Sequence, residues 1–440
     1  MAGYEAVIGL EVHVQIKTDS KMFCKCPNRF GSEPNTNVCP VCMGHPGVLP
    51  TPNREAIRKT VMAGLMTECR IPNRSKFDRK SYFYPDMPKN YQLTQYGMPF
   101  CLAGRIHIHG KGFSGEEMAD KYIGLTRIHL EEDVAKLTHF GDCSGVDFNR
   151  AGVPLMEIVS EPDMRSADEA YAYLTALKQI MQFGGIGDCD MEKGQMRCDV
   201  NISIRHRGDE KFGTKIELKN LNSFRAVHRA ISYEIKRQIV MLEAGDVIHQ
   251  ETRGWNDDAG ESSLMRSKEN ANDYRYFPEP DLMPVVLSDE DIEAIRKTLP
   301  ELPEQKRERY VQDYALTDYD AHVITLDRDL AAYFERAADK SKAPNWVIGD
   351  FMRLIGEEKI EIADCKVKPE SLAAMVDMIQ SGAINGKIAK TVFEEMFKTG
   401  KEAADIVKEK GLVQVSDESA ITGFVDQVIA ANPAQVQQFK

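Results

Sequence analysis

A β-strand is predicted for Val7-Ile-Gly-Leu-Glu-Val-His-Val-Gln-Ile16, close to the N-terminus. From Leu10 onwards apolar and polar side chains alternate, which is the period of a strand with one apolar face. Glu11 and His13 therefore project from the same polar face, about 7 Å apart along the strand. A carboxylate and an imidazole presented in this way suit a metal ion or a proton transfer. A solvated outer face explains the same alternation, so the strand alone leaves both interpretations open.

The length and composition of the chain predict a soluble protein of several domains. Because 440 residues exceed what one hydrophobic core usually serves, we expect two or three domains. The sequence has neither a run of about twenty apolar residues nor a signal-peptide layout, so we expect a cytoplasmic protein that does not cross a membrane. The net charge of −12 argues against indiscriminate binding of nucleic acid, although residues 51–90 carry a local excess of Lys and Arg.

Residues 1 to about 290 show mixed strand and helix patterns. Short alternating stretches bounded by turn residues predict strands, and apolar stripes of helical period predict helices. The strands are expected at 104–109, 200–205 and 215–219, and the helices at 167–181 and 226–242.

The chain after about residue 290 is predicted to be helical. Ser288-Asp-Glu-Asp has the composition of a capped helix start, and Pro369 suits a first helical turn. Gly382, Gly400 and Gly411 stand where successive helices should end. Short helices with tight joints indicate a small bundle. Because no closing helix or cap precedes the last residues, we expect the final domain to be incomplete.

Four of the ten cysteines have the spacing of a zinc site. Cys24-Lys-Cys26 is followed by twelve residues and then by Cys39-Pro-Val-Cys42. Cysteines two or three residues apart can both reach one ion, and soft thiolates in a tetrahedron favour zinc. Four sulfur ligands leave no open position for water, so the predicted role is structural. Four unrelated cysteines are the alternative interpretation.

Further acidic residues lie in predicted strands. His129 and Glu131 share one face of the stretch 126–133, and Glu157 and Glu217 each lie within an apolar run. A carboxylate flanked by hydrophobic residues is costly to bury unless it meets a cation or hydrogen-bond donors. Together with the pair on the first strand, these acids predict a shared cation, and an oxygen-rich ligand set suits Mg²⁺. Exposure on one face of a strand is the alternative for each residue.

The stretch 75–91 interleaves aromatic residues with cations, namely Lys76, Arg79, Lys80 and Lys89. Bases or sugars can stack on such rings while the cations contact phosphates. A basic strand and turn with core aromatics is the alternative. The sequence contains no Walker-A motif, no dinucleotide-binding fingerprint, and no Ser or Cys nucleophile in a recognisable context. Any nucleotide chemistry must therefore use a different phosphate-binding surface.

Taken together, the longer motifs resemble one family, the B subunit of the bacterial tRNA-dependent amidotransferases (GatB). The resemblance covers essentially the whole chain. It is carried by Ile8-Gly-Leu-Glu-Val-His-Val, Pro46-Gly-Val-Leu-Pro50, Lys76-Phe-Asp-Arg-Lys-Ser-Tyr-Phe-Tyr-Pro-Asp86, His129-Leu-Glu-Glu-Asp, Glu157-Ile-Val-Ser-Glu-Pro-Asp163, Glu217-Leu-Lys-Asn-Leu-Asn-Ser-Phe224 and Asp273-Tyr-Arg-Tyr-Phe-Pro-Glu-Pro-Asp281.

The resemblance implies an ATP-dependent carbon–nitrogen ligase that works as a heterotrimer. Its substrate is a misacylated tRNA, Glu-tRNA(Gln) or Asp-tRNA(Asn). ATP phosphorylates the side-chain carboxylate, and ammonia displaces the phosphate. An A subunit supplies the ammonia by hydrolysing glutamine, and a small C subunit completes the complex. A nucleophile on the A subunit would explain why none is recognisable in this chain.

The same resemblance implies roles for individual residues. The expected magnesium ligands are Glu11, His13, Glu131 and Glu157. The expected catalytic residues are Lys80, Glu131 and Glu217. The expected ATP contacts are Lys80 and Lys89. Phosphoryl transfer from ATP depends mostly on positioning and on neutralising charge with Mg²⁺ and cations, which suits such a set.

The resemblance also implies an α+β architecture in three parts. Residues 1–290 form a cradle-like mixed α/β catalytic domain with a zinc-binding loop at 24–42. Residues 291–400 form an all-α helical domain. Residues 401–440 begin a truncated, YqeY-like helical tail that binds tRNA.

Two other functions are compatible with parts of the sequence. The first is a non-catalytic, zinc-containing adaptor that binds tRNA and carries its acids on the surface. The second is a free-standing zinc hydrolase that uses His13, His45, His129 and Glu11, although the His-Glu-x-x-His spacing of such enzymes is absent.

Overall fold

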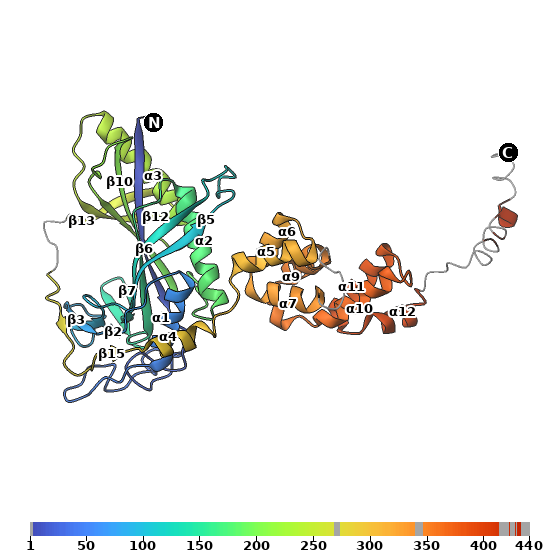
Figure 1. Cartoon of the computed structure of the whole chain (residues 1–440), viewed down its shortest axis with the longest axis horizontal. Helices are drawn as coiled ribbons and strands as arrows, with labels where there is room; N and C mark the ends of the chain where they lie inside the picture. Colours follow the sequence, from blue (N-terminus) through green and yellow to red (C-terminus); the bar gives the residue numbers. More distant parts are fainter. Residues whose placement is uncertain are drawn as a thin grey trace. The chain divides into compact units, whose positions relative to one another are not determined.

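The computed structural model describes residues 3–267, 273–338, 346–412, 422, 427 and 429–432 (Figure 1). It divides into two compact units, Met1–Leu302 and Pro303–Lys440. The first unit contains strands and helices, whereas the described part of the second is helical. The predicted α+β class is therefore confirmed. None of the helices in the described part of the chain is long and apolar enough to cross a membrane.

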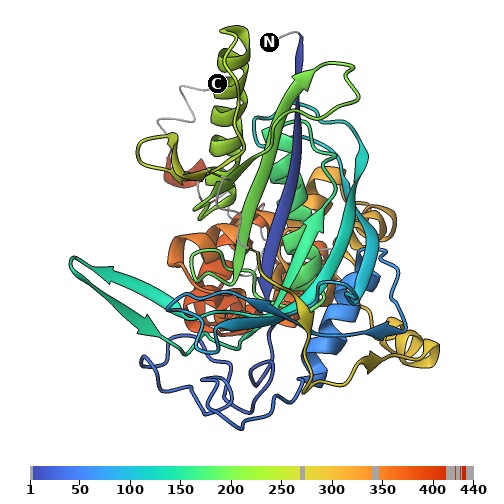
Figure 2. The ribbon, with the colours of Figure 1, turned by 90° about the vertical axis from the view of Figure 1, so that its left-hand side faces the viewer.

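An eight-stranded sheet forms the centre of the first unit, in the order β13-β12-β11-β10-β1-β9-β6-β5. Neighbouring strands are antiparallel except for the parallel pair β11 and β12. The strands are β1 (Tyr4–Gln15), β5 (Cys101–Ile108), β6 (Lys121–Glu132), β9 (Pro154–Ser160), β10 (Met196–His206), β11 (Ile216–Lys219), β12 (Glu251–Asn256) and β13 (Glu261–Ser267). Figure 2 shows β1, in dark blue, running through the middle of this sheet.

The two faces of β1 have opposite characters. Leu10, Val12 and Val14 are buried in one hydrophobic core together with residues of three helices. These helices are α1 (Arg54–Met66), α2 (Ala167–Phe183) and α3 (Phe224–Glu243). Each fully buried aliphatic side chain contributes roughly 1.5–3 kcal/mol, so the core determines which face of β1 turns inward. Glu11 and His13 consequently project from the other face.

A small sheet lies over the end of this polar face. It has the order β14-β3-β4 and consists of β3 (Asp78–Ser81), β4 (Tyr91–Thr94) and β14 (Phe277–Pro278). Side-chain hydrogen bonds fasten it to β6: Gln92 Nε2 donates to the carbonyl of Glu132 (2.7 Å), and Thr94 Oγ1 donates to Glu131 (3.0 Å). The small sheet thereby covers one end of the polar face.

Smaller elements complete the first unit. β2 (Arg74–Ser75) pairs with β15 (Val285–Val286), and β7 (Lys136–Phe140) forms a hairpin with β8 (Cys143–Asp147) that extends away from the main sheet (Figure 2). The predicted helix start at Ser288 is observed, with a complete capping box before α4 (Asp289–Arg296). Ile292 and Ile295 pack against the core of the first unit, which explains why its compact part extends to Leu302.

The second unit is built from short helices. Pro369 begins α10 as predicted, and Gly400 and Gly411 end α11 and α12 in the left-handed conformation, with φ of +74° and +62°. Its described helices are α5 (Pro303–Tyr314), α6 (Asp318–Thr325), α7 (Arg328–Ala338), the π-helix η2 (Val347–Phe351), α9 (Met352–Glu358), the 3₁₀ turn η3 (Ile362–Asp364), α10 (Pro369–Gln380), α11 (Gly386–Thr399) and α12 (Ala403–Lys410). Most of the predicted tail at 401–440 lies outside the described residues.

We predict that Gly64→Ala destabilises the first unit. A Cβ at Gly64 in α1 would lie 2.4 Å from the sulfur of Cys101 on β5, so the helix would have to move away from the sheet. Overpacking of this kind costs about 1–3 kcal/mol, which outweighs the roughly 1 kcal/mol by which Ala favours a helix. Thermal unfolding measures the effect.

The matched control is Gly356→Ala in α9, where a Cβ would meet nothing within 4 Å. This variant should be as stable as the parent or slightly more stable. Equal stability of both variants would contradict the close packing of α1 on β5.

Candidate active site

Strand register brings three polar residues into one row on the polar face. His13 on β1 lies opposite Glu157 on β9, and Glu157 lies opposite His129 on β6. Side chains at paired positions of neighbouring strands stand on the same face, roughly 5 Å apart. Glu131 follows two residues after His129 and therefore projects on the same side. The row and Glu131 form a compact cluster of two carboxylates and two imidazoles.

The distances within this cluster suit a shared cation. His13 Nε2 lies 3.3 Å from Glu157 Oε2 and 3.8 Å from Glu131 Oε1. His129 Nε2 lies 3.7 Å from Glu131 Oε2 and 3.6 Å from Glu157 Oε2. One ligand atom each from His13, Glu131 and Glu157 lies within 4.8 Å of the other two. These three residues can hold a metal ion in common.

The cluster is electrostatically coupled. Burial opposes the charge on His13, but its hydrogen bond to Glu157 and the nearby carboxylates hold the pKa of His13 above its ordinary value. Burial alone would raise the pKa of both glutamates. The nearby imidazole of His129 holds the pKa of Glu131 below its ordinary value, and His129 and His13 hold the pKa of Glu157 far below it. Both carboxylates are therefore ionised at neutral pH and available to a cation.

The cluster forms part of the wall of a cavity of about 400 Å³, which also contains Lys80. Lys80 lies on β3, in the small sheet that covers the polar face. Burial opposes its charge, but the carboxylates of Glu131 and Glu157 hold the pKa of Lys80 above its ordinary value. Lys80 is thus an ammonium near the two carboxylates, and it could neutralise the charge of a phosphate group in the cavity.

Aromatic residues line another part of this cavity. The rings of Tyr96 and Tyr276 are stacked, with centroids 4.2 Å apart and planes 9° from parallel. The ammonium of Lys80 lies 4.8 Å from the ring centroid of Tyr274, and Arg127 donates to the carbonyl of Tyr96 (3.3 Å). Nucleotide bases can stack on such rings while the neighbouring cations neutralise the phosphates.

The remaining acids of the cavity lie beyond the cluster and have polar partners of their own. Glu11 accepts a hydrogen bond from Asn201 (2.8 Å) and is not among the three residues whose ligand atoms come together. Glu217 on β11 accepts from Thr252 Oγ1 (2.7 Å) and lies 3.1 Å from the ammonium of Lys219, which also contacts Asp199. All of these residues except Asn201 and Thr252 line the cavity.

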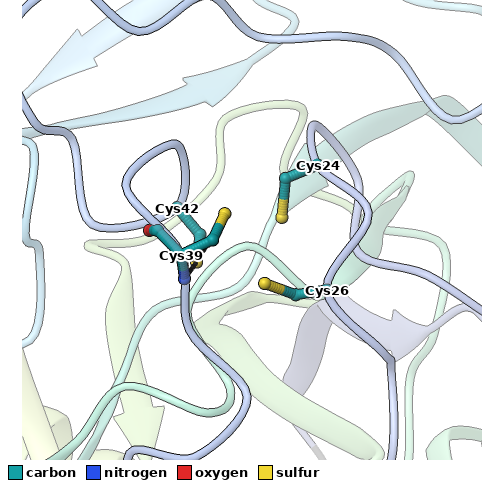
Figure 3. Close-up of side chains that lie close together, drawn as sticks. All are labelled: Cys24, Cys26, Cys39 and Cys42. Carbon is teal, nitrogen blue, oxygen red and sulfur yellow. Dashed lines mark hydrogen bonds between the residues drawn. The ribbon is translucent and has the colours of Figure 1, made fainter.

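The four predicted zinc ligands come together in a second site (Figure 3). Cys24 and Cys26 lie on one loop, Cys39 and Cys42 lie on another, and their sulfur atoms are turned toward one another. All four sulfurs lie within 4.8 Å of one another, and those of Cys39 and Cys42 are 3.9 Å apart. Sulfurs bound to one zinc ion at about 2.3 Å lie roughly 3.8 Å apart, so the arrangement can hold a metal ion.

The thiols also influence one another. A hydrogen bond from Cys24 lowers the pKa of Cys42 to about 4, and the same contact raises the pKa of Cys24 well above its usual range. Burial raises the pKa of Cys26 to about 11. Shared protons of this kind are expected where thiols are crowded, and a divalent cation replaces them readily because it binds thiolates.

Comparison with known proteins identifies the family of the chain. The GatB/GatE catalytic domain matches residues 6–293, and the GatB domain named GatB Yqey matches residues 330–440. The chain belongs to the GatB family. It is 52% identical to the B subunit of the aspartyl/glutamyl-tRNA(Asn/Gln) amidotransferase of Carboxydothermus hydrogenoformans, over 100% of this chain and 92% of that protein. Identity to the protein of the same name from Geotalea uraniireducens is also 52%, over 99% of this chain and 92% of that protein.

The predicted family is confirmed by these matches, and so is the predicted function as a subunit of a tRNA-dependent amidotransferase. The relatives are named as B subunits, so GatB-family chains of this kind belong to complexes of several subunits. The roles of individual residues are not tested by such matches. They stay predictions that the geometry of the cavity supports to different degrees.

The structure brings most of the predicted site residues of this GatB-family chain together, but Lys89 lies apart. Its ammonium contacts Glu132 and lies 5.6 Å from the ring centroid of Tyr91. It lines a different cavity, of about 210 Å³, beside Cys24 and Cys42. Lys89 does not line the cavity that contains Lys80, so the structure gives its predicted contact with ATP no support.

His129, Asp199 and Lys219 are among the residues of the cavity that were not predicted as magnesium ligands or catalytic residues. His129 stands two positions before Glu131 on the same predicted face, so the alternation of that strand was the available signal. Asp199 and Lys219 have no comparable local signal. They reach the cavity because β10 and β11 follow β1 in the sheet.

Asp133 anchors the end of β6 that carries the two adjacent glutamates. Its buried carboxylate accepts hydrogen bonds from Arg197 (2.9 Å) and Gln15 (2.8 Å), and Arg150 lies 3.7 Å away. Burial would raise the pKa of Asp133, but the charges of Arg197 and Arg150 hold it below its ordinary value of 3.8.

We predict that Asp133→Asn lowers the free energy of unfolding at neutral pH by about 2 kcal/mol, because charge-assisted hydrogen bonds are lost. A folded pKa below the unfolded one stabilises the protein above the unfolded pKa, and this contribution disappears as the pH falls through the folded pKa. The difference between variant and parent should therefore shrink below about pH 4. Urea unfolding at several pH values measures it.

Asp188→Asn is the matched control, because Asp188 forms an exposed ion pair with Lys17. Such pairs contribute little, so this variant should unfold like the parent at every pH. A deficit of Asp133→Asn that does not depend on pH would contradict the electrostatic explanation.

Proposed function

We propose that this chain phosphorylates the side-chain carboxylate of Glu-tRNA(Gln), Asp-tRNA(Asn) or both with ATP, and that ammonia then displaces the phosphate to form the amide. The observation that carries this proposal is one cavity in which His13, Glu131 and Glu157 converge and which Lys80 also lines. A metal-binding cluster beside a buried cation is what phosphoryl transfer from ATP requires.

The chemistry explains why the cavity has this composition. A carboxylate is a poor acceptor for ammonia until it becomes an acyl phosphate. Mg²⁺ bound by His13, Glu131 and Glu157 would neutralise phosphate charge and orient the phosphates of ATP. Lys80 faces the same place from the opposite sheet and would stabilise the charge of the transferred phosphoryl group. Glu217 is a candidate to accept the proton that ammonia loses when it becomes an amide.

The aromatic part of the cavity supports an adenine-containing substrate. The stacked rings of Tyr96 and Tyr276 lie beside the cationic groups of Lys80 and Arg127. Stacking of a base on an aromatic side chain contributes about 1–3 kcal/mol and does not depend on a nucleotide-binding motif. This is consistent with ATP use by a chain that has no Walker-A sequence.

Partner subunits would supply the ammonia for amide formation. We propose a heterotrimer in which a glutaminase A subunit produces ammonia and a small C subunit completes the complex. The supporting observation is that the relatives are named as B subunits. The glutamine donor also agrees with the absence of a recognisable Ser or Cys nucleophile motif from the sequence.

We propose that the four-cysteine site holds a structural Zn²⁺. Four sulfur ligands at near-tetrahedral spacing would fill the coordination of the ion, so its contribution would be to the folding of the loop at 24–42. The cavity of the proposed kinase site does not include these cysteines. The two metals would therefore have separate tasks.

We predict that Glu131→Gln lowers ATP-dependent amidation of Glu-tRNA(Gln) at least about 100-fold, because a charged metal ligand is lost. The measurement uses the full chain reconstituted with A and C subunits. Binding of tRNA and hydrolysis of glutamine should be retained, since neither needs this carboxylate.

Glu243→Gln, at the exposed end of α3 and outside the cavity, is the control and should be fully active. If Glu131→Gln amidates at the parental rate while tRNA still binds, the kinase assignment is wrong. The chain would then better fit the alternative of a non-catalytic adaptor for tRNA.

We predict that Cys39→Ser abolishes or strongly reduces bound zinc, because a hydroxyl replaces a thiolate in a four-sulfur set. Metal analysis of the purified chain measures the zinc content. The control is Cys143→Ser, since Cys143 is exposed and lies outside the cluster. Undiminished zinc in Cys39→Ser would exclude the proposed zinc site.

A further inference from the structure

Lys21 is fully buried next to the cysteine cluster. Its exposed fraction is 0%, which is rare for a lysine. The ammonium lies 3.7 Å from the sulfur of Cys42 and 3.3 Å from the carbonyl oxygen of Phe148. The sulfur of Cys42 also accepts from the backbone N–H of Cys39 (3.2 Å). Two donors therefore point at one sulfur atom.

The burial of Lys21 needs a counter-charge. Moving an ammonium out of water costs several kcal/mol unless an anion and hydrogen-bond acceptors compensate. The carbonyl of Phe148 is an acceptor but carries no net charge. Within the described ranges, no carboxylate forms an ion pair with Lys21, and the sulfur of Cys42 becomes its counter-charge when this cysteine is a thiolate.

A metal centre with four thiolate ligands carries excess negative charge. Four thiolates around a divalent ion leave a net charge of about −2 in a partly buried site. A nearby cation and hydrogen bonds to sulfur reduce the electrostatic cost of collecting this charge. The requirements of the lysine and of the thiolates are complementary.

We propose that Lys21 is a positioning residue of the metal centre, whose ammonium donates to the sulfur of Cys42 and thereby helps to retain a divalent, thiolate-bound metal. The inference rests on the zinc site of the proposed function. It adds a residue that the four-cysteine spacing does not indicate, because Lys21 precedes the first cysteine and binds no metal itself.

The second hydrogen bond of Lys21 links the cysteine loop to another segment of the chain. Through Phe148, the lysine joins the cysteine loop to the segment before β9. In the same region the N–H of Met22 donates to Gly152 (2.7 Å), and the N–H of Gly152 donates to Asp133 (2.9 Å). These hydrogen bonds place the segment that carries Lys21 next to the end of β6, on which Glu131 lies.

The test compares Lys21→Met with Lys25→Met in the purified full chain loaded with zinc. Lys25 stands between Cys24 and Cys26 but is exposed, so both variants remove one charge from the same loop. Zinc release to an excess of a chromogenic chelator is measured. Loss of an outer partner of a metal ligand costs about 10–100-fold in metal affinity, so we expect Lys21→Met to release zinc about 10–100-fold faster and Lys25→Met to match the parent.

Cobalt substitution supplies a readout that a loss of packing would not produce. A hydrogen bond to a thiolate lowers the energy of the sulfur electrons. Its removal should shift the sulfur-to-cobalt charge-transfer absorption of Lys21→Met to longer wavelength, while Lys25→Met should keep the parental spectrum. Lys21→Gln, which keeps a donor but no charge, replaces Lys21→Met if the latter does not fold and should release zinc faster than the parent.

Each outcome bears on one proposal. Faster release with the spectral shift supports the role of Lys21. The role is overturned if Lys21→Met releases zinc at the parental rate and keeps the parental spectrum. Where Lys21→Gln is used instead, zinc release at the parental rate overturns it. Neither result contradicts the zinc site itself. A parent chain that holds no zinc overturns the zinc site and this inference together.

Discussion

The site depends on the register of three antiparallel strands. Pairing of His13 with Glu157, and of Glu157 with His129, places residues far apart in the sequence within one cation-sized cluster. A shift by one residue between any two strands would turn part of this set into the hydrophobic core. The apolar side chains of β1 oppose such a shift because they are buried in one hydrophobic core with residues of three helices. The core of the unit is thus also what specifies the site.

Enclosure by the small sheet determines how strongly these charges interact. Burial penalises each ionised group, yet the carboxylates stay ionised because imidazoles and an ammonium surround them. Lys80 comes from β3, whereas its anionic partners come from β6 and β9. Opposite charges are therefore held on two separate sheets, with room between them for a polar ligand.

Local patterns predicted the strands and the ligand types but not every neighbour. The alternation at Leu10 to Val14 was sufficient for β1, because a half-buried strand has a period of two, and the spacing of the cysteines indicated their cluster. Family motifs pointed to Glu131 and Glu157. His129 was not selected although it shares a predicted face with Glu131, whereas Asp199 and Lys219 reach the cavity only through the order of the strands. Lys80 and Lys89 share one basic stretch, yet they reach different cavities because the chain turns between β3 and β4. A linear pattern contains no information about that turn.

Glu131 and Glu132 are neighbours on β6 and project to opposite sides, one toward His13 and Glu157 and the other toward Lys89. Both are buried, so this single strand end separates two polar cavities by the thickness of its backbone. A displacement of the strand end would deform both cavities at once, and neither can be remodelled independently of the other. Evolutionary change in one cavity is consequently constrained by the contents of the other.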